Sequence, residues 1–388
     1  HYGRGLGSRK SIVFLFISIF GTLLFSCQSV QQKSETVEFS YELIDSTAHF
    51  RIDRASSHFR LKVKNPFAGS DAEESYVFYP RDSAKPKGVS AQHFIPTPVN
   101  SLVITSSTHL GYLKALNKET AIAGAKNLGY AYDRSFLEQL KSGEIVDLGE
   151  AEFNREKLIA LNADAVFAYA IDGAAYREVD NLRRLNQSAV MLAEFMESDP
   201  IAKAKWLEVV ALFFGEKELA SAIAQIQAIE NRYYEMQKLA KQADHKPKVM
   251  IGLPWKGTWY VAGGKSFQAK LIEDANAEYL WKEKGDKASL PLDIEYVFEH
   301  ALKADFWMNP GPAKSLNDIL ERDHRFDAFQ AFQQGKVFNQ NRRLSASGGN
   351  DYWESAVVKP DVILADLIAI FHPQLLPNHE LYYYQNIE

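Results

Sequence analysis

The chain has 388 residues, of which 46% are hydrophobic, 24% charged and 12% aromatic. This composition is typical of a globular protein and excludes a disordered or collagen-like chain, while the length predicts more than one domain or lobe. Lys and Arg number 44 against 49 Asp and Glu, which gives a net charge of -5 and disfavours a nucleic-acid-binding protein. The single cysteine, Cys27, excludes a disulfide framework and a thiolate zinc site.

Residues 1–26 predict a signal peptide of the lipoprotein type. Three basic residues precede an apolar run over 11–25, which as a helix would span about 22 Å, too short for a hydrocarbon core of about 30 Å. The run ends at Leu24-Phe25-Ser26-Cys27, which resembles a bacterial lipobox, although a buried cysteine in an ordinary apolar segment is the alternative. We expect cleavage before an acylated Cys27, which leaves a net charge of -8 because three basic and no acidic residues are removed.

Residues 27–98 predict a polar tether followed by a β-rich extension. Apolar and polar residues alternate over 36–80, as in Phe59-Arg60-Leu61-Lys62-Val63, which indicates an antiparallel meander. Residues 81–98 are rich in Pro, Lys and Ser and are expected to form a connector. The extension receives no functional assignment from its sequence.

Residues 99–200 predict an α/β lobe. Short apolar strands alternate with helices, and Asn154 is placed to cap one of them, so we expect a mainly parallel sheet covered by helices. Ser107 and Thr108 are placed to cap the helix after the first strand. The expected strands are 102–104, 121–124, 165–168 and 189–192.

A linking helical region over 201–246 contains an amphipathic helix over 216–243, about 42 Å long. It is interpreted as an internal strut, with a coiled-coil dimer helix as the alternative. A second α/β lobe is expected over 247–388, with a closing helix over about 356–371. Its expected strands include 249–253, 304–308 and 335–338.

One helix–strand unit occurs in each predicted lobe. Glu156 opens a helix that leads to Ala163-Asp164 and a strand, and Glu295 opens a helix that leads to Ala304-Asp305 and a strand. The second copy has two more residues between the Glu and the Asp. The repeat favours two similar lobes that face each other across a ligand cleft.

The sequence contains no complete catalytic or metal-binding motif. Gly263-Gly264-Lys265-Ser266 lacks the first glycine of a phosphate-binding loop, because position 259 is Trp. Ser347 lacks the preceding glycine of a nucleophile elbow, because position 345 is Ser. The histidines form no ligand cluster, so neither an enzyme nor a resident metal or cofactor is predicted.

Aromatic residues gather in loops that follow predicted strands and helices. Loops beyond strand carboxyl ends form the ligand crevice of open α/β sheets, and Trp and Tyr pack against flat ligands while keeping a polar group. Core packing is the alternative for each residue. The predicted ligand-binding aromatics are Tyr130, Tyr132, Trp255, Trp259, Tyr260, Trp281, Tyr352 and Trp353.

From about residue 97 to the C-terminus the chain resembles the periplasmic binding proteins that deliver iron chelates and cobalamin to ABC importers. The motifs that carry the resemblance are moderately specific one by one, and their order is the stronger signal. They are Ser106-Ser107-Thr108-His109, Ile122-Ala123-Gly124, Asn154-x-Glu156, Trp259-Tyr260-x-x-Gly263-Gly264, Asp351-Tyr352-Trp353-Glu354 and Lys359-Pro360-Asp361.

The resemblance implies two α/β lobes bridged by one long helix, with a metal chelate bound between them and Glu156 and Glu295 docked on the permease. It implies a lipid-anchored protein of the periplasm or cell envelope, with no cofactor of its own. Ferric chelates are often anionic, and the basic candidates for such a ligand are few, namely Arg342, Arg343 and Lys256. The tryptophan that cobalamin binders carry before the first-lobe Glu is replaced by Gly149-Glu150-Ala151, so ferric siderophore, cobalamin and haem stay open. The alternatives are an envelope enzyme acting in the same cleft, a haem-binding lipoprotein and a structural lipoprotein.

Overall fold

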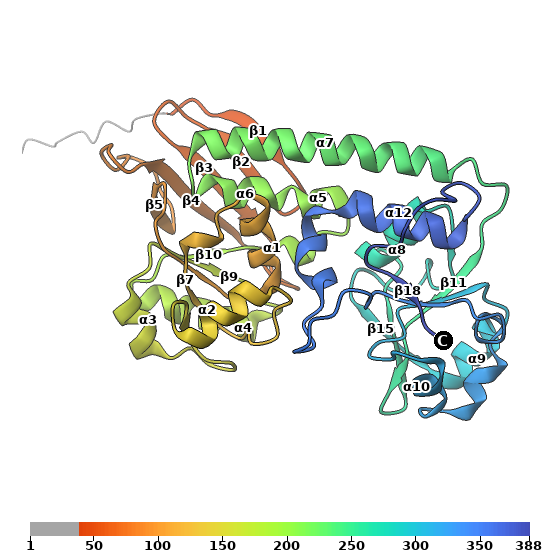
Figure 1. Ribbon diagram of the computed structural model, residues 1–388. Coiled ribbons are helices and arrows are strands. Elements are labelled where there is room, and N and C mark those ends of the chain that lie inside the picture. Colours follow the sequence, from red (N-terminus) through yellow and green to blue (C-terminus); the bar gives the residue numbers. More distant parts are fainter. Residues whose placement is uncertain (1–38) are drawn as a thin grey trace, which may run out of the picture. The chain divides into compact units, whose positions relative to one another are not determined.

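Four β-sheets and one long helix organise residues 39–388, the part of the chain that the computed structural model describes (Figure 1). The predicted signal peptide, Cys27 and the predicted polar tether over 28–34 lie outside these residues. No helix in the described part is long and apolar enough to cross a membrane.

The N-terminal extension forms a five-stranded sheet in the order β1-β2-β3-β4-β5. The first four strands are the predicted antiparallel meander, but β5 pairs parallel with β4 inside the segment that was predicted to be a connector. Pro96 is tolerated in β5 because this strand lies at the sheet edge. The strands are β1 (Glu42–Ser46), β2 (Phe50–Arg54), β3 (Phe59–Lys64), β4 (Glu73–Pro80) and β5 (His93–Thr97).

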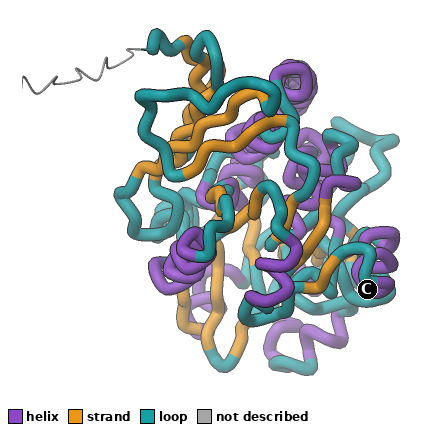
Figure 2. Tube along the Cα trace, turned by 90° about the vertical axis from the view of Figure 1, so that its left-hand side faces the viewer, coloured by secondary structure: helices purple, strands orange, loops and turns teal. Residues whose placement is uncertain are grey.

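The N-terminal lobe contains a fully parallel sheet in the order β10-β9-β6-β7-β8. Figure 2 views the molecule from the side of this lobe, with strands in orange and helices in purple. Its central strands are buried along their whole length, as expected for a parallel sheet covered by helices. The strands are β6 (Leu102–Ile104), β7 (Ile122–Ala125), β8 (Val146–Asp147), β9 (Ala165–Ala168) and β10 (Ala189–Met191). The helices are α1 (Ser107–Ala115), α2 (Arg134–Ser142), α3 (Arg155–Leu161) and α4 (Gly173–Arg184).

The long helix α7 (Glu216–Ala240) has 25 residues and lies within the predicted range. Its apolar face is covered by α6 (Trp206–Leu212) and by α12 (Pro360–Phe371), so the face that could have formed a coiled coil is used inside the chain. Before α6 lies the short α5 (Pro200–Ala204). Because α6 directly follows the N-terminal lobe in sequence and α12 belongs to the C-terminal half, α7 joins the two halves of the fold.

The C-terminal half contains a mixed sheet and a separate antiparallel sheet. The mixed sheet has the order β14-β11-β16-β17-β18, parallel except for β18, and the second sheet has the order β12-β13-β15. The strands are β11 (Lys248–Ile251), β12 (Pro254–Trp255), β13 (Thr258–Ala262), β14 (Glu278–Tyr279), β15 (Ser289–Asp293), β16 (Phe306–Met308), β17 (Val337–Asn339) and β18 (Gln385–Asn386). The helices are α8 (Phe267–Asp274), α9 (Ile294–Ala301), α10 (Leu316–Leu320) and α11 (Gln330–Gln333).

A buried ion pair joins the N-terminal sheet to the N-terminal lobe. Arg183 on α4 donates to both carboxylate oxygens of Glu74 on β4, at 2.9 Å each. The hydroxyls of Tyr76 and Tyr176 also donate to this carboxylate. Burial and the Glu74 carboxylate raise the pKa of Tyr176 to about 12, which keeps its phenol protonated as a donor. The extension is therefore bonded into the lobe through a fully partnered carboxylate.

Replacing Arg183 with Met should destabilise the protein by about 3–5 kcal/mol, because it leaves the buried Glu74 carboxylate without its cation. Adding Glu74→Gln should restore part of the loss. Urea unfolding measures the free energy of unfolding of Arg183→Met and of the double variant. Arg134→Ala is the control, because Arg134 forms an exposed ion pair with Glu138 that is worth about 0.5 kcal/mol or less. A loss for Arg183→Met no larger than that of the control would contradict the assignment.

Candidate functional site

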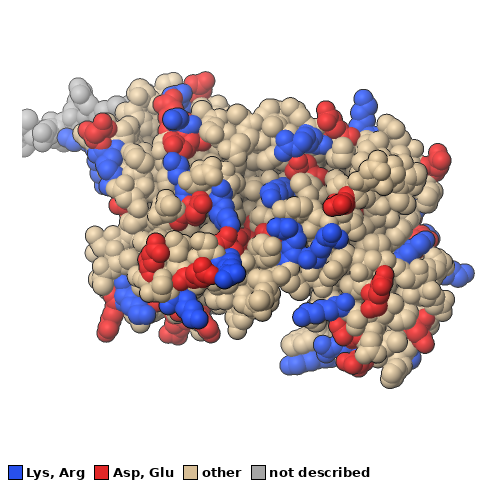
Figure 3. Space-filling model, in the orientation of Figure 1, with Lys and Arg blue, Asp and Glu red and all other residues tan. Residues whose placement is uncertain are grey.

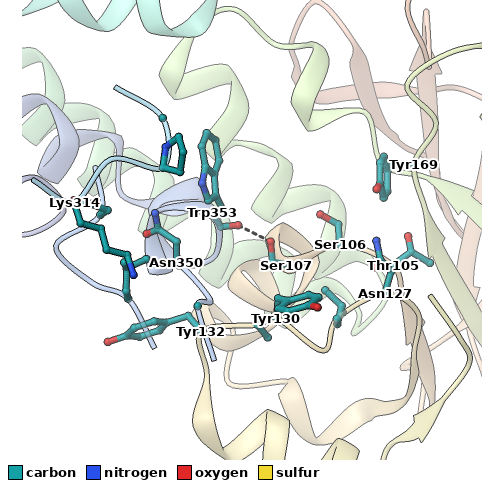
Figure 4. A pocket seen from close by; sticks show the side chains of 17 residues that line it. Thr105, Ser106, Ser107, Asn127, Tyr130, Tyr132, Tyr169, Lys314, Asn350 and Trp353 are labelled. Atoms are coloured by element: carbon teal, nitrogen blue, oxygen red, sulfur yellow. Dashed lines mark hydrogen bonds between the residues drawn. The ribbon is translucent and has the colours of Figure 1, made fainter. Parts of the chain in front are cut away.

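A cavity of about 640 Å³ lies where loops of the N-terminal lobe meet loops of the C-terminal half (Figure 4). Its position follows from the two parallel sheets. Thr105, Asn127 and Tyr169 come within two residues of the carboxyl ends of β6, β7 and β9, while Gly311 and Asn341 follow β16 and β17. The cavity is thus built at the strand ends where open α/β sheets bind ligands, and its volume suits a small molecule.

Local hydrogen bonds fix the N-terminal side of the cavity. The N-cap of α1 is Ser106, whose hydroxyl accepts the amide of Thr108, so the predicted caps Ser107 and Thr108 are off by one or two residues. The Ser107 hydroxyl is therefore free to donate to the carbonyl of Trp353 at 2.8 Å, across to the C-terminal half. Asn127 adopts a left-handed backbone conformation with φ of 58°, which asparagine tolerates better than most residues.

The lining is polar and aromatic, with one charge. Lys314 is the charged side chain in the lining, and hydroxyls, amides and tyrosine rings supply most of the remaining polar groups. Neither His, Cys, Asp nor Glu belongs to the lining, and residues 39–388 contain no cluster of three such residues that could hold a metal. The arrangement can stack against a flat ligand, donate hydrogen bonds and offset a negative charge.

Three predicted ligand-binding residues line the cavity, namely Tyr130, Tyr132 and Trp353. Tyr130 is 73% exposed and Trp353 is 50% exposed, so both present large aromatic surface to solvent. Their contact with a ligand stays a prediction. The sequence analysis missed Tyr169 and Lys314, although Tyr169 follows a predicted strand and the strand-end rule that selected Tyr130 would have found it.

Three other predicted aromatics are core residues, which corrects their assignment to the cleft. Trp259 is fully buried on the inner face of β13, and its indole donates to the carbonyl of Ile251 at 3.0 Å. Trp281 and Tyr352 are 3% and 5% exposed, and the ring of Tyr352 packs edge-on against that of Trp353. The alternation of β13 turns Trp259 inward, which the proximity of several aromatics in the sequence did not reveal.

The remaining predictions fall on the surface outside the cavity. Trp255 and Tyr260 lie on the β12–β13 hairpin, 60% and 45% exposed, and neither lines the cavity. Arg342 is exposed and also absent from the lining. Its neighbour Arg343 contributes indirectly, because it pairs with Asp351 at 2.6 Å and its guanidinium lies over the ring of Tyr132.

Glu156 and Glu295 occupy equivalent places in the two halves. Each is exposed in the first turn of a helix, α3 and α9, whose N-caps are Asn154 and Asp293. Glu295 also pairs with Arg325 at 2.8 Å. A carboxylate at this place stabilises the helix dipole, so the geometry alone is compatible with a local role. Their predicted contact with a permease stays a prediction.

Glu354 is a buried carboxylate next to the cavity, and although it belongs to the Asp351-Tyr352-Trp353-Glu354 motif it was not predicted as a site residue. It is 1% exposed and accepts the backbone amides of Tyr132 and Asp133 at 2.9 and 3.3 Å. Burial raises the pKa of Glu354 to about 7, although these two amides oppose the shift. A carboxylate from the C-terminal half thus holds a loop of the N-terminal lobe.

The fold is that of a two-lobed α/β binding protein, with the cavity between its lobes. The family model described as periplasmic binding protein matches residues 102–343, so the chain belongs to the periplasmic binding protein family. Members of this family bind substrates for transport and are not enzymes. The match confirms the family predicted from the sequence motifs.

Known proteins agree with this fold. The chain is 25% identical to an uncharacterized lipoprotein of Methanocaldococcus jannaschii over 355 residues, 87% of this chain and 78% of that protein. A periplasmic heme binding protein from Pseudomonas aeruginosa superposes with a TM-score of 0.55 and 13% identity, covering 75% of this chain and 98% of the other. The vitamin B12 binding protein of Vibrio cholerae gives a TM-score of 0.51 and 10% identity, covering 73% and 99%.

The raised pKa of Glu354 predicts a pH-dependent stability difference between the wild type and Glu354→Gln. The carboxyl of Glu354 has a pKa of about 7 in the folded protein and 4.5 in the unfolded chain, so the folded state binds this proton more tightly. The free energy of unfolding of the wild type therefore falls as the pH rises from about 4.5 to about 7 and above. Glutamine does not titrate. Relative to the wild type, Glu354→Gln should therefore gain about 2–3 kcal/mol between pH 5 and pH 8. Urea unfolding at both pH values measures the difference, and parallel profiles would contradict it.

Proposed function

We propose that this chain is the lipid-anchored substrate-binding component of an ABC importer and captures a metal chelate in the cavity between its lobes. The carrying observation is the cavity itself, placed at the carboxyl ends of two parallel sheets and lined by Tyr130, Tyr132, Tyr169 and Trp353 in a chain of the periplasmic binding protein family. Similar structures include a heme binding protein, a vitamin B12 binding protein and a protein of an Fe³⁺-hydroxamate transport system.

The lining supports a ligand whose metal is already coordinated. Because the described residues that line the cavity include no carboxylate, imidazole or thiolate, a bare divalent ion would find no usual ligand set among them. Aromatic faces and amide groups suit a preformed organic chelate, and Lys314 favours one with negative charge. Haem stays a distinct candidate, because a tyrosine phenolate can ligate its iron and three tyrosines line the cavity.

Calorimetric titration tests the ligand class directly. The protein without its signal peptide is titrated with ferrichrome, ferric enterobactin, haem and cyanocobalamin, and binding of one of them in the micromolar range or tighter is expected. Failure of all four would overturn the chelate assignment. Haem bound through a tyrosine would also shift its absorption spectrum, which separates it from the other candidates.

Trp353→Ala should weaken binding of the chelate about 30- to 150-fold, because about 100 Å² of aromatic surface against a ligand is worth about 2–3 kcal/mol. The matched control is Trp255→Ala, which removes a similarly exposed tryptophan outside the cavity and should leave affinity unchanged. Calorimetry gives both affinities, and thermal unfolding verifies that each variant is folded. Equal losses in the two variants would remove Trp353 from the site.

Docking on the permease is assigned to Glu156 and Glu295. Helices α3 and α9 lie on the side of the molecule away from α7 (Figure 1), where acidic and basic side chains are exposed (Figure 3) and a membrane partner could meet both lobes at once. Exposed carboxylates that meet basic pockets govern encounter and orientation more than folding. This role extends the proposed importer function to two named side chains.

The double variant Glu156→Arg, Glu295→Arg should keep chelate affinity and thermal stability, while stimulation of the importer ATPase in proteoliposomes falls at least about tenfold. Each single variant should lose less. Glu235→Arg reverses a charge on α7, away from both helices, and serves as the control. Full stimulation by the double variant would leave both residues with helix capping alone.

Cys27→Ala should release the protein from the membrane into the soluble envelope fraction without unfolding it. The reason is that acylation of the single cysteine is the proposed anchor. Fractionation followed by immunoblotting measures the release, and cellular thermal unfolding of the variant verifies the fold. Retention of Cys27→Ala in the membrane after a salt wash would show that something other than this cysteine holds the protein there.

A further inference from the structure

A segment of the C-terminal half, Gly348–Glu354, packs directly against the N-terminal lobe beside the cavity; we call it the clasp. Two glycines show how close the backbones approach. A Cβ on Gly349 would lie 2.3 Å from the carbonyl oxygen of Ala131, and one on Gly111 of α1 would lie 2.0 Å from the carbonyl oxygen of Glu354. Neither position has room for a side chain, so the contact is made by backbone against backbone.

The clasp carries parts of the cavity from the C-terminal side. Gly348, Asn350 and Trp353 belong to the lining, and Figure 4 shows Trp353 bonded to Ser107 across the site. On the N-terminal side, the clasp contacts the loop that carries Tyr130 and Tyr132, because Gly349 lies against the backbone of Ala131. The clasp therefore joins two walls of one cavity.

Glu354 ends the clasp, and its side-chain carboxylate accepts hydrogen bonds from the N-terminal lobe. A single oxygen, Oε2, accepts the amides of Tyr132 and Asp133, the residues at the start of α2. The carboxylate of Asp133 is already engaged, because it caps the amide of Phe136 at 2.7 Å and pairs with Lys114. Among the hydrogen bonds of the described residues, Glu354 is thus the acceptor for these two amides.

We propose that Glu354 is a positioning residue of the cavity, whose carboxylate, supplied by the C-terminal half, fixes the conformation of the Tyr130–Asp133 wall supplied by the N-terminal lobe. The assignment of this wall to ligand binding rests on the proposed function. The positioning itself rests on the two hydrogen bonds, on the burial of the carboxylate and on the backbone contact around it. Without the acceptor, two amides beside the cavity lose their partner and the wall is free to move.

The amides themselves report the positioning without any ligand. Hydrogen exchange followed by mass spectrometry is measured on peptides covering residues 128–137 in the protein without its signal peptide. Glu354→Ala should accelerate exchange of the Tyr132 and Asp133 amides by about tenfold or more, because their acceptor is gone. Glu354→Gln keeps a carbonyl oxygen at the same reach and should stay within about threefold of the wild type.

Asp164 provides a matched control on the same lobe. One of its oxygens accepts two backbone amides, those of Asn100 and Ser101, at 2.6 and 3.4 Å, at the amino end of β6 and away from the cavity. Asp164→Ala should accelerate exchange around residues 98–102 and leave residues 128–137 unchanged. If Glu354→Ala does not fold, Glu354→Asp withdraws the carboxylate by one methylene and should accelerate the same two amides.

The proposal is wrong if exchange at residues 128–137 is unchanged in Glu354→Ala, or in Glu354→Asp where Glu354→Ala does not fold. It is also wrong if the amides of Glu354→Gln exchange as fast as those of Glu354→Ala.

A second measurement links positioning to binding. Titration with cyanocobalamin and with ferrichrome should give a dissociation constant about tenfold weaker for Glu354→Ala and within threefold for Glu354→Gln. If the wild type binds neither probe, it is the ligand class of the proposed function that fails, and the exchange result still decides the role of Glu354.

Discussion

The structure depends on the way α7 spans both halves of the chain. The apolar face of α7 packs on α6, next to the N-terminal lobe, and on α12, in the C-terminal half. These two contacts hold the parallel sheet of the N-terminal lobe and the mixed sheet of the C-terminal half together. Both sheets then present the carboxyl ends of their strands to a common space, and the loops that follow β6, β7, β9, β16 and β17 become the walls of a single cavity. Neither half could build this site alone, since the aromatic residues come from both.

The N-terminal sheet is bonded into the same body. Its β4 contributes Glu74 to the buried pair with Arg183, and rings on its inner face pack against the linking region, such as Phe50 against Trp206 with ring centroids 5.3 Å apart. The C-terminal half also reaches the extension, because the ammonium of Lys287 donates to the carbonyl of Met196 at 3.3 Å and lies 3.4 Å from the imidazole of His49. The extension thus supports the lobe that carries Tyr130, rather than standing as a separate module on a tether.

Periodicity and capping were enough to predict most of the architecture, because both are local signals. Three patterns show which face a segment buries. They are the alternation of apolar and polar residues over 36–80, the continuous apolar runs of the parallel strands, and the helical spacing of the apolar residues in α7. The strand over 93–97 was missed because Pro96 and the polar residues before it resemble a loop, and only its parallel partner β4 makes it a strand. The capping of α3 by Asn154 was predictable because a capping motif is local. For α1 the cap was predicted at Ser107 or Thr108 instead of Ser106, because φ and ψ decide which of several adjacent hydroxyl residues caps.

The site was predictable only in part, because proximity in sequence does not say which way a side chain points. Trp259 and Tyr260 are neighbours, yet strand alternation buries the first and exposes the second. Tyr130 and Trp353 were found because each lies in a loop beyond a strand or turn, where the sheet geometry directs the chain toward the cavity. Glu354 had no such signal. Its role depends on a contact between residues 132 and 354, and a buried glutamate that accepts amides from the other lobe can be recognised only once both lobes are in place. Residues that join the walls of an interlobe site are therefore the ones that a single sequence is least able to reveal.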